Sequence, residues 1–154
     1  MKPYKVGITI GIFDLFHRGH LNLVKSAKEL CDYLIVGIHS DEYVLKCKHR
    51  PSIFSYDDRK AIMESVVYVD EVVKNEAPID LELCKRIKFD AIFIGDDWKG
   101  TPGWKRVEDM FAPLGRTVVY LNYTKCISTT QIREMIAETS ISKFEKNKEG
   151  LNKQ

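Results

Sequence analysis

The sequence predicts an α/β protein built on a doubly wound parallel sheet with helices on both faces. Short, apolar, β-branched segments alternate along the chain with segments of helical periodicity, as they do in parallel sheets with crossover helices. The 154 residues suffice for one compact domain with a real core and are too few for two. We therefore expect one domain over residues 1–140 and a polar, lysine-rich tail over residues 141–154.

The expected strands are short and rich in apolar, β-branched residues, which is typical of buried strands. They are residues 5–10, 33–39, 70–73, 90–94 and 118–121.

Between these strands, apolar spacing and capping residues predict helices. The expected helices cover residues 20–31, 57–66, 80–87 and 104–114, and a last one starts at Ser128 or Thr129. The polar and basic segment 40–55 is expected to form a loop.

The charge balance excludes some classes of partner. The net charge is +2, from 24 basic and 22 acidic residues, which does not favour nucleic acid or an anionic membrane as partner. No apolar run is long enough to span a bilayer, and no signal-peptide pattern is visible. The four cysteines are scattered without a Cys-x-x-Cys pair, so we expect free thiols and a cytoplasmic location.

The first candidate site is the segment His17-Arg18-Gly19-His20, between an expected strand and an expected helix. Free backbone N–H groups and the helix dipole attract anions at such a position, and two imidazoles there can donate to phosphate oxygens. Gly19 allows a ligand to approach the backbone closely. A metal site and a pair of solvated histidines are the alternatives, but no third metal ligand is evident nearby, and the position at a strand end favours phosphate.

Three further segments lie where strands are expected to end, at the edge where doubly wound sheets bind ligands. Ile127-Ser128-Thr129-Thr130 offers hydroxyls at a helix start, although a simple helix cap has the same pattern. Lys46 and Lys48 suit polyphosphate, although a solvated basic loop is the ordinary explanation. Gly95-Asp96-Asp97-Trp98 offers carboxylates for ribose, a base amine or a metal.

These segments together resemble the cytidylyltransferase family, which contains glycerol-3-phosphate, phosphocholine and phosphoethanolamine cytidylyltransferases. Residues 11–20, 68–73 and 127–130 are similar to three family segments in the expected order. Residues 95–98 resemble the bacterial glycerol-3-phosphate enzymes, whereas Ile12, in place of threonine, is closer to the phosphocholine enzymes. The resemblance implies a Rossmann-like nucleotidyltransferase fold, a homodimer, and cytidylyl transfer from CTP, with Mg²⁺ carried by the CTP and no further metal site assigned.

The resemblance also implies a role for each matching residue. The catalytic residues implied are His17, His20, Lys46 and Lys48, with the choice between the two lysines left open. The nucleotide-binding residues implied are Gly11, Ile12, Phe13, Asp14, Gly19, Asp96, Asp97, Trp98, Thr124, Ile127, Ser128 and Thr129. The substrate-binding residues implied are Lys46, Asp41, Asp70, Tyr123 and Lys125.

The chain departs from the family pattern at two places. Val66 and Val67 stand where many relatives have arginine, and Tyr123 and Cys126 replace an arginine and a glycine before the Ile-Ser-Thr segment. The acceptor is therefore open: glycerol 3-phosphate, giving CDP-glycerol and pyrophosphate, is expected, with phosphocholine, phosphoethanolamine or a phosphonate as alternatives. An ATP-dependent adenylyltransferase and a non-catalytic nucleotide-binding regulator are the other hypotheses.

Overall fold

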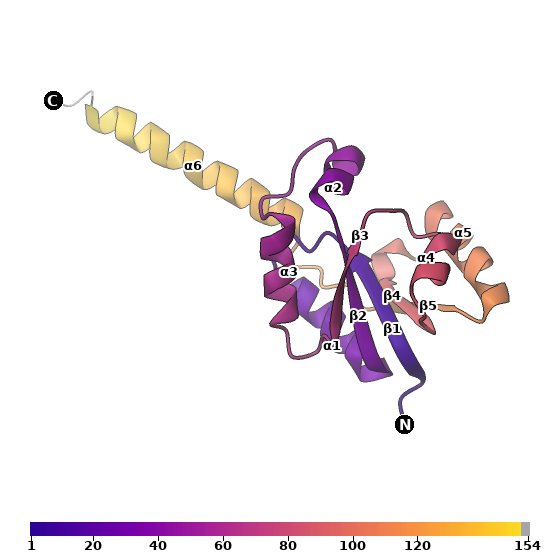
Figure 1. Cartoon of the computed structure of the whole chain (residues 1–154). Coiled ribbons are helices and arrows are strands. Elements are labelled where there is room, and N and C mark those ends of the chain that lie inside the picture. Colours follow the sequence, from indigo (N-terminus) through magenta and orange to yellow (C-terminus); the bar gives the residue numbers. More distant parts are fainter. Residues whose placement is uncertain (152–154) are drawn as a thin grey trace.

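The computed structural model describes the backbone of residues 1–151 and the side chains of residues 1–141. Strands and helices alternate as predicted, with strand bounds within two residues of the expected ones (Figure 1). The elements in chain order are β1(Tyr4–Gly11), α1(Arg18–Leu30), β2(Cys31–His39), α2(Asp41–Lys48), α3(Tyr56–Glu64), β3(Glu71–Asn75), α4(Leu81–Arg86), β4(Ala91–Gly95), the 3₁₀ helix η1(Asp96–Trp98), α5(Pro102–Phe111), η2(Ala112–Leu114), β5(Thr117–Leu121) and α6(Thr129–Leu151).

The described backbone forms one five-stranded sheet in the order β3-β2-β1-β4-β5. Every neighbouring pair in this sheet is parallel. The chain moves outward from β1 to β3 and then returns to the other side of β1 with β4. The strand order therefore reverses between β1 and β4, and in doubly wound sheets the ligand crevice lies outside the carboxyl ends of strands at such a point.

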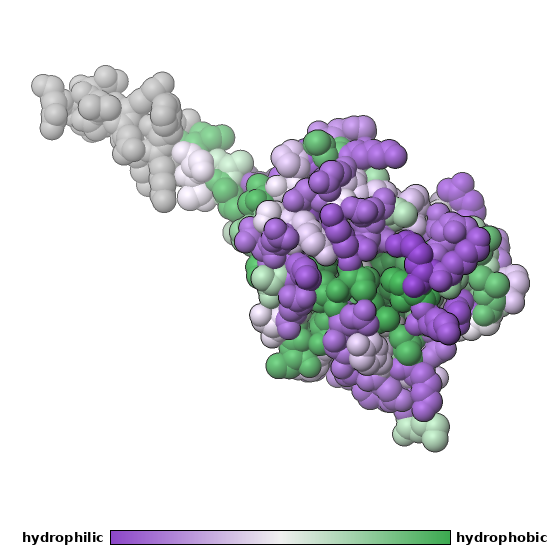
Figure 2. All heavy atoms as spheres, viewed as in Figure 1, coloured by the Kyte–Doolittle hydropathy of each residue, from purple (hydrophilic) through white to green (hydrophobic). Residues whose placement is uncertain are grey.

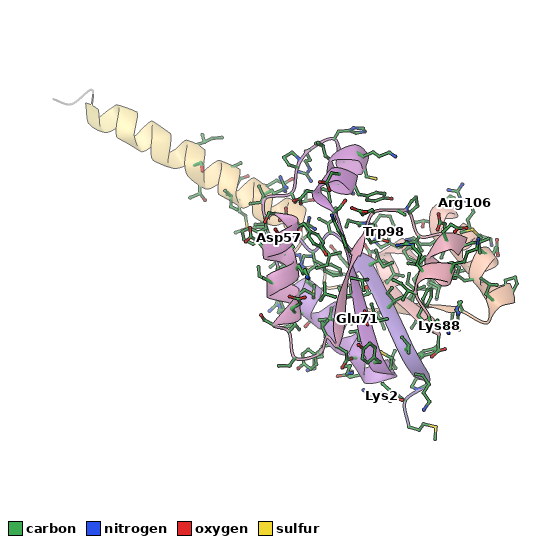
Figure 3. All side chains as sticks on the ribbon, in the orientation of Figure 1. Lys2, Asp57, Glu71, Lys88, Trp98 and Arg106 are labelled. Atoms are coloured by element: carbon green, nitrogen blue, oxygen red, sulfur yellow. The ribbon has the colours of Figure 1, made fainter. Side chains whose placement is uncertain are left out.

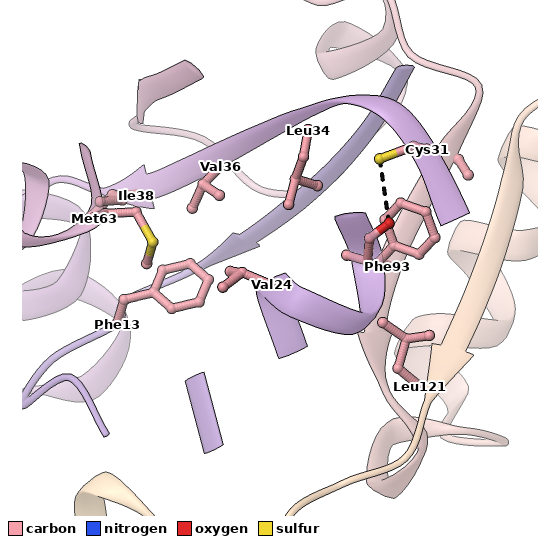
Figure 4. Packing of buried hydrophobic residues seen from close by; sticks show 11 residues of the cluster. Phe13, Val24, Cys31, Leu34, Val36, Ile38, Met63, Phe93 and Leu121 are labelled. Atoms are coloured by element: carbon pink, nitrogen blue, oxygen red, sulfur yellow. Dashed lines mark hydrogen bonds between the residues drawn. The ribbon is translucent and has the colours of Figure 1, made fainter. Parts of the chain in front are cut away.

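Helices cover both faces of the sheet, so the predicted fold class is confirmed. One apolar cluster joins α1 and α3 to the sheet; Figure 4 shows Phe13 beside Val24 and Met63 in it. The other joins α4 and α5 to the opposite face through Leu83 and Phe111. Because helices bury both faces of the sheet, the strand sequences are continuous apolar runs and do not alternate between apolar and polar residues.

The segment expected to be a loop over residues 40–55 contains a helix, so this expectation was wrong. The Ser40 Oγ accepts from the Tyr43 N–H and caps α2 at its start. Asp41 lies in the first turn and Lys48 in the last, where each charge suits the helix dipole. Within this segment, the loop is confined to residues 49–55.

The last helix extends further than expected. α6 continues through Leu151 and projects away from the sheet (Figure 1), although a frayed tail was expected from residue 142 onward. Residues 129–149 contain neither proline nor glycine, so nothing in that stretch interrupts a helix. Residues 152–154 lie outside the described residues, and the boundary at residue 140 stays a prediction. No helix in the described part of the chain is long and apolar enough to cross a membrane.

Candidate active site

A cleft of about 540 Å³ opens at the carboxyl ends of β1 and β4, where the strand order reverses. Figure 3 shows Trp98 toward this edge of the molecule and Lys2 at the opposite edge. In Figure 2 apolar residues gather in the middle of the displayed face, between α2 and the α4–α5 side. The predicted residues that line the cleft are Gly11, Ile12, Phe13, Asp14, His17, Gly19, His20, Lys48, Asp97, Trp98, Tyr123, Thr124, Ser128 and Thr129.

His17 caps the start of α1 with its own ring. Its Nδ1 accepts a hydrogen bond of 3.0 Å from the Gly19 N–H. In the neutral ring the proton therefore lies on Nε2, which becomes the donor available to a ligand. A Cβ on residue 19 would lie 2.8 Å from the His17 Cε1, so the glycine is required for this ring position.

His20 is stacked on His17, with ring centroids 3.8 Å apart. The rings of Phe13 and Phe16 also pack against it. Burial, with a smaller effect from the adjacent His17, lowers the pKa of His20 to about 3, and burial also lowers the pKa of His17. Both rings are thus neutral hydrogen-bonding groups near pH 7. The His20 Nδ1 is buried without a hydrogen-bond partner among the described residues.

The loop between β1 and α1 is held in an unusual backbone conformation. Phe13 and Leu15 have positive φ angles of 55° and 50°, which cost about 1–3 kcal/mol each in a non-glycine residue. Asp14 stabilises this loop, since its buried carboxylate accepts from the N–H groups of Leu15, Ile53 and Phe54. These contacts make Asp14 a support of the loop.

Two arginines that the sequence analysis did not select hold the loops around the cleft. Arg133 of α6 lines the cleft and pairs with Asp14 at 3.1 Å, and it also donates to the Pro51 carbonyl. Arg59 of α3 is buried, pairs with Asp41 at 2.7 Å and donates to the carbonyls of Ile12 and His39. Neither belongs to a short motif. The sequence feature that could have indicated Arg59 is its place on the apolar side of a predicted helix, four residues before the buried Met63.

The two candidate lysines, Lys46 and Lys48, lie in the last turn of α2 and differ in their position relative to the cleft. Both lysines are exposed, but only Lys48 lines the cleft, together with Arg50. Among the described residues, the cleft is therefore lined by three cations, Lys48, Arg50 and Arg133, as well as by His17 and His20.

The two adjacent carboxylates after β4 have different surroundings. Asp97 lines the cleft, and burial raises its pKa. Asp96 does not line the cleft; its Oδ1 accepts from the Tyr123 N–H at 3.0 Å and so joins the ends of β4 and β5. Asp97 is thus the carboxylate placed to contact a ligand.

The segment after β5 reaches the cleft in part. Thr124 accepts from the Asn22 amide at 3.0 Å, and Ser128 caps α6 by accepting from the Gln131 N–H. Lys125 lies in a turn and does not line the cleft, so it does not extend beside Tyr123 as an extended segment would allow. Ile127 also does not line the cleft.

Asp41 and Asp70, expected to bind substrate, have protein partners in this structure, and their substrate role stays a prediction. The Asp41 carboxylate is occupied by Arg59, by the Tyr56 N–H and by the Ser52 hydroxyl. Asp70 lies just before β3, at the amino ends of the strands, and pairs with Lys28. Neither lines the cleft. Asp70 lies toward the amino ends of the strands, at the edge opposite the site, whereas Asp41 lies at the carboxyl end of β2 with its carboxylate bonded to these partners.

The residues present suit a magnesium ion only if it arrives with phosphate oxygens. Among the described residues no group of three His, Cys, Asp or Glu side chains is arranged to hold a metal. Mg²⁺ typically binds one or two carboxylates together with substrate phosphates and water. Asp97 is the cleft carboxylate available for such a contact.

The fold and the cleft define a class of protein. Two helix N-termini, the stacked neutral histidines His17 and His20, and several cations line one cleft at the switch point of a doubly wound sheet, as suits an enzyme acting on a nucleotide polyphosphate. Residues 8–135 match the cytidylyltransferase-like family model, and the chain belongs to this family. The predicted enzyme class, a nucleotidyltransferase, is confirmed.

Individual relatives agree with this placement. The chain is 42% identical to glycerol-3-phosphate cytidylyltransferase of Bacillus subtilis over 132 residues, which are 84% of this chain and 95% of that protein. It is 47% identical to the FAD synthase of Pyrococcus abyssi over 88 residues, 56% of this chain and 60% of that protein. A lipopolysaccharide core biosynthesis protein from Thermoplasma volcanium has the same fold, with a TM-score of 0.66 and 24% identity over 80% of this chain and 99% of that one.

Proposed function

We propose that this enzyme transfers a cytidylyl group from CTP to glycerol 3-phosphate, giving CDP-glycerol and pyrophosphate. The observation that carries the proposal is the orientation of the His17 ring. Its Nδ1 accepts from the Gly19 N–H, which leaves the Nε2–H as a donor in a cleft that Lys48 and Arg50 also line. The identity to glycerol-3-phosphate cytidylyltransferases over 84% of the chain supports the choice of nucleotide and acceptor.

The chemistry requires no protein nucleophile. An oxygen of the acceptor phosphate attacks the α-phosphorus of CTP, and the bond from that phosphorus to the bridging oxygen breaks as pyrophosphate leaves. Catalysis then consists of positioning and of stabilising charge on the phosphate oxygens. His17 donates through Nε2–H, Lys48 and Arg50 neutralise charge, and the starts of α1 and α6 offer backbone N–H groups. Mg²⁺ that arrives with the triphosphate would neutralise part of its charge.

A pyrophosphate-release assay tests the proposal. Each nucleoside triphosphate is paired with glycerol 3-phosphate, phosphocholine, phosphoethanolamine and a phosphonate. ATP belongs in the panel because of the similarity to FAD synthases. We expect CTP with glycerol 3-phosphate to give the highest kcat/KM. If another acceptor gave a kcat/KM about tenfold higher than glycerol 3-phosphate, the proposed acceptor would be wrong, whereas the proposed cytidylyl transfer would stand. The homodimer, the cytoplasmic location and the lack of nucleic-acid or membrane partners stay predictions.

A further inference from the structure

Beside the cleft lies a recess of about 350 Å³ with no charged residue among the described residues that line it. It shares His39, Tyr43, Ile79, Trp98 and Trp104 with the cleft, so a ligand in the cleft can extend into it. Because most of this shared wall is aromatic or aliphatic, the imidazole of His39 is its main polar group for orienting a neutral ligand.

The protonation of His39 is set by a chain of hydrogen bonds from α4. Arg86 Nη2 donates to the Asn75 Oδ1 at 3.2 Å, and Asn75 Nδ2 donates to the Ala77 carbonyl at 2.6 Å. These two bonds determine which end of the Asn75 amide is nitrogen. The same Nδ2 lies 3.2 Å from the His39 Nδ1, and two N–H donors cannot face each other there. Nδ1 is therefore the acceptor, and the proton lies on Nε2.

This arrangement leaves the Nε2–H of His39 as a directed donor. One ring face is covered by Tyr43, with centroids 4.6 Å apart and planes at 19°. Within the described side chains Nε2 has no hydrogen-bond partner. Burial, helped by the positive charges of Arg59 and Lys48, lowers the pKa of His39 despite the opposing effect of a hydrogen bond with the Asn75 backbone. The ring thus stays neutral and suits an uncharged oxygen better than an anion.

We propose that His39 is a specificity-determining residue that donates its Nε2–H hydrogen bond to a hydroxyl oxygen of the acceptor. The inference rests on the proposed function and adds to it the group that recognises the alcohol end. His39 lies just before α2 and Lys48 ends that helix, so both border the same wall of the cleft. A phosphomonoester with its phosphate at Lys48 then extends its hydroxylated chain toward His39. The ligand class is a small phosphomonoester that carries a free hydroxyl group.

The variant His39→Phe tests this role, because phenylalanine keeps a ring against Tyr43 and removes the donor. Pyrophosphate release is measured with CTP and either glycerol 3-phosphate or monopropyl phosphate, which has the same carbon chain without hydroxyls. We expect His39→Phe to lower kcat/KM for glycerol 3-phosphate about tenfold, mainly through KM, and to leave monopropyl phosphate unchanged. His39→Gln, which keeps an N–H donor, should recover part of the preference. His49→Asn, at an exposed histidine that lines neither the cleft nor the recess, is the matched control and should preserve it.

An equal loss with both acceptors, or an unchanged preference in His39→Phe, would overturn the role of His39 and leave the proposed function standing. A wild-type chain that releases no pyrophosphate with any pair would contradict the proposed function. The role of His39 is then decided by a long-range ¹H–¹⁵N spectrum of the wild-type chain titrated with glycerol 3-phosphate. We expect an Nε2–H tautomer whose resonance moves on titration. An Nδ1–H tautomer, or an Nε2 resonance that does not move, would refute the inference.

Discussion

His17 and His39 lie in different parts of one cleft and are held in the same way. Each ring accepts a hydrogen bond at Nδ1, is stacked on a second ring, and has its pKa lowered by burial. Each is thereby a neutral donor through Nε2. The difference lies in the source of the orienting group, which is the Gly19 backbone for His17 and the Asn75 side chain for His39.

The two donors depend on different parts of the structure. Gly19 is two residues from His17, so the orientation is a local property of a helix start. Asn75 is 36 residues from His39, so its donor depends on β2 and β3 pairing in the correct register. The first donor belongs to the phosphate end of the cleft, and the second borders the uncharged recess.

The largest expected effect comes from removing the histidine stack at the phosphate end. His17→Ala and His20→Ala should each keep the fold and lower kcat about 10²–10³-fold, as the loss of one oxyanion donor does. Steady-state kinetics with CTP and circular dichroism are the measurements. Near-normal kcat in either variant would show that the stacked pair does not stabilise the transition state.

The variant Asn75→Leu should lower the stability of the fold and also release the His39 ring from its hydrogen bond. It leaves Arg86, the Ala77 carbonyl and the His39 Nδ1 without a buried partner. We expect the free energy of unfolding to fall by about 1–3 kcal/mol, measured by urea denaturation. His39→Phe, which leaves Asn75 bonded to Ala77 and Arg86, is the control and should lose less. If Asn75→Leu were as stable as the wild type, the hydrogen-bond chain would not hold the ring.

The buried state of His20 predicts how stability depends on pH. Its folded pKa of about 3 is below the ordinary 6.5, so the unfolded chain binds more protons between these values. Stability should therefore be complete above pH 6.5 and fall as the pH decreases toward 3, by about 1 kcal/mol per pH unit from this group. Urea denaturation at several pH values measures the slope. His20→Asn should flatten it, and an unchanged slope would place the effect on other groups.

The smallest effect separates the two lysines of α2. Lys48→Ala should lower kcat/KM about tenfold because its charge lies in the cleft, whereas Lys46→Ala should be close to the wild type. Steady-state kinetics with both substrates measure the two variants side by side. Equal losses would mean that α2 turns to present both side chains.

Much of the fold and part of the site follow from local sequence signals. Apolar strand segments separated by periodic helices predict the doubly wound sheet, and helix starts after β1 and β5 predict the phosphate end. The same reasoning missed α2, because its basic residues suggested a loop although Ser40 is a good cap. The family resemblance implied a substrate role for Asp70, which lies just before β3, toward the amino ends of the strands and away from the cleft.

The sequence by itself determined what neighbouring residues accomplish together, such as the capping of α1 by His17 beside Gly19. Only the tertiary structure decided which side chains meet across the sheet. Arg133 reaches Asp14 across 119 residues, and Asn75 reaches His39 across 36. The physical reason is that a backbone hydrogen bond within one helical turn depends on local conformation, whereas a bond between distant side chains requires strand order, register and helix direction to be established first.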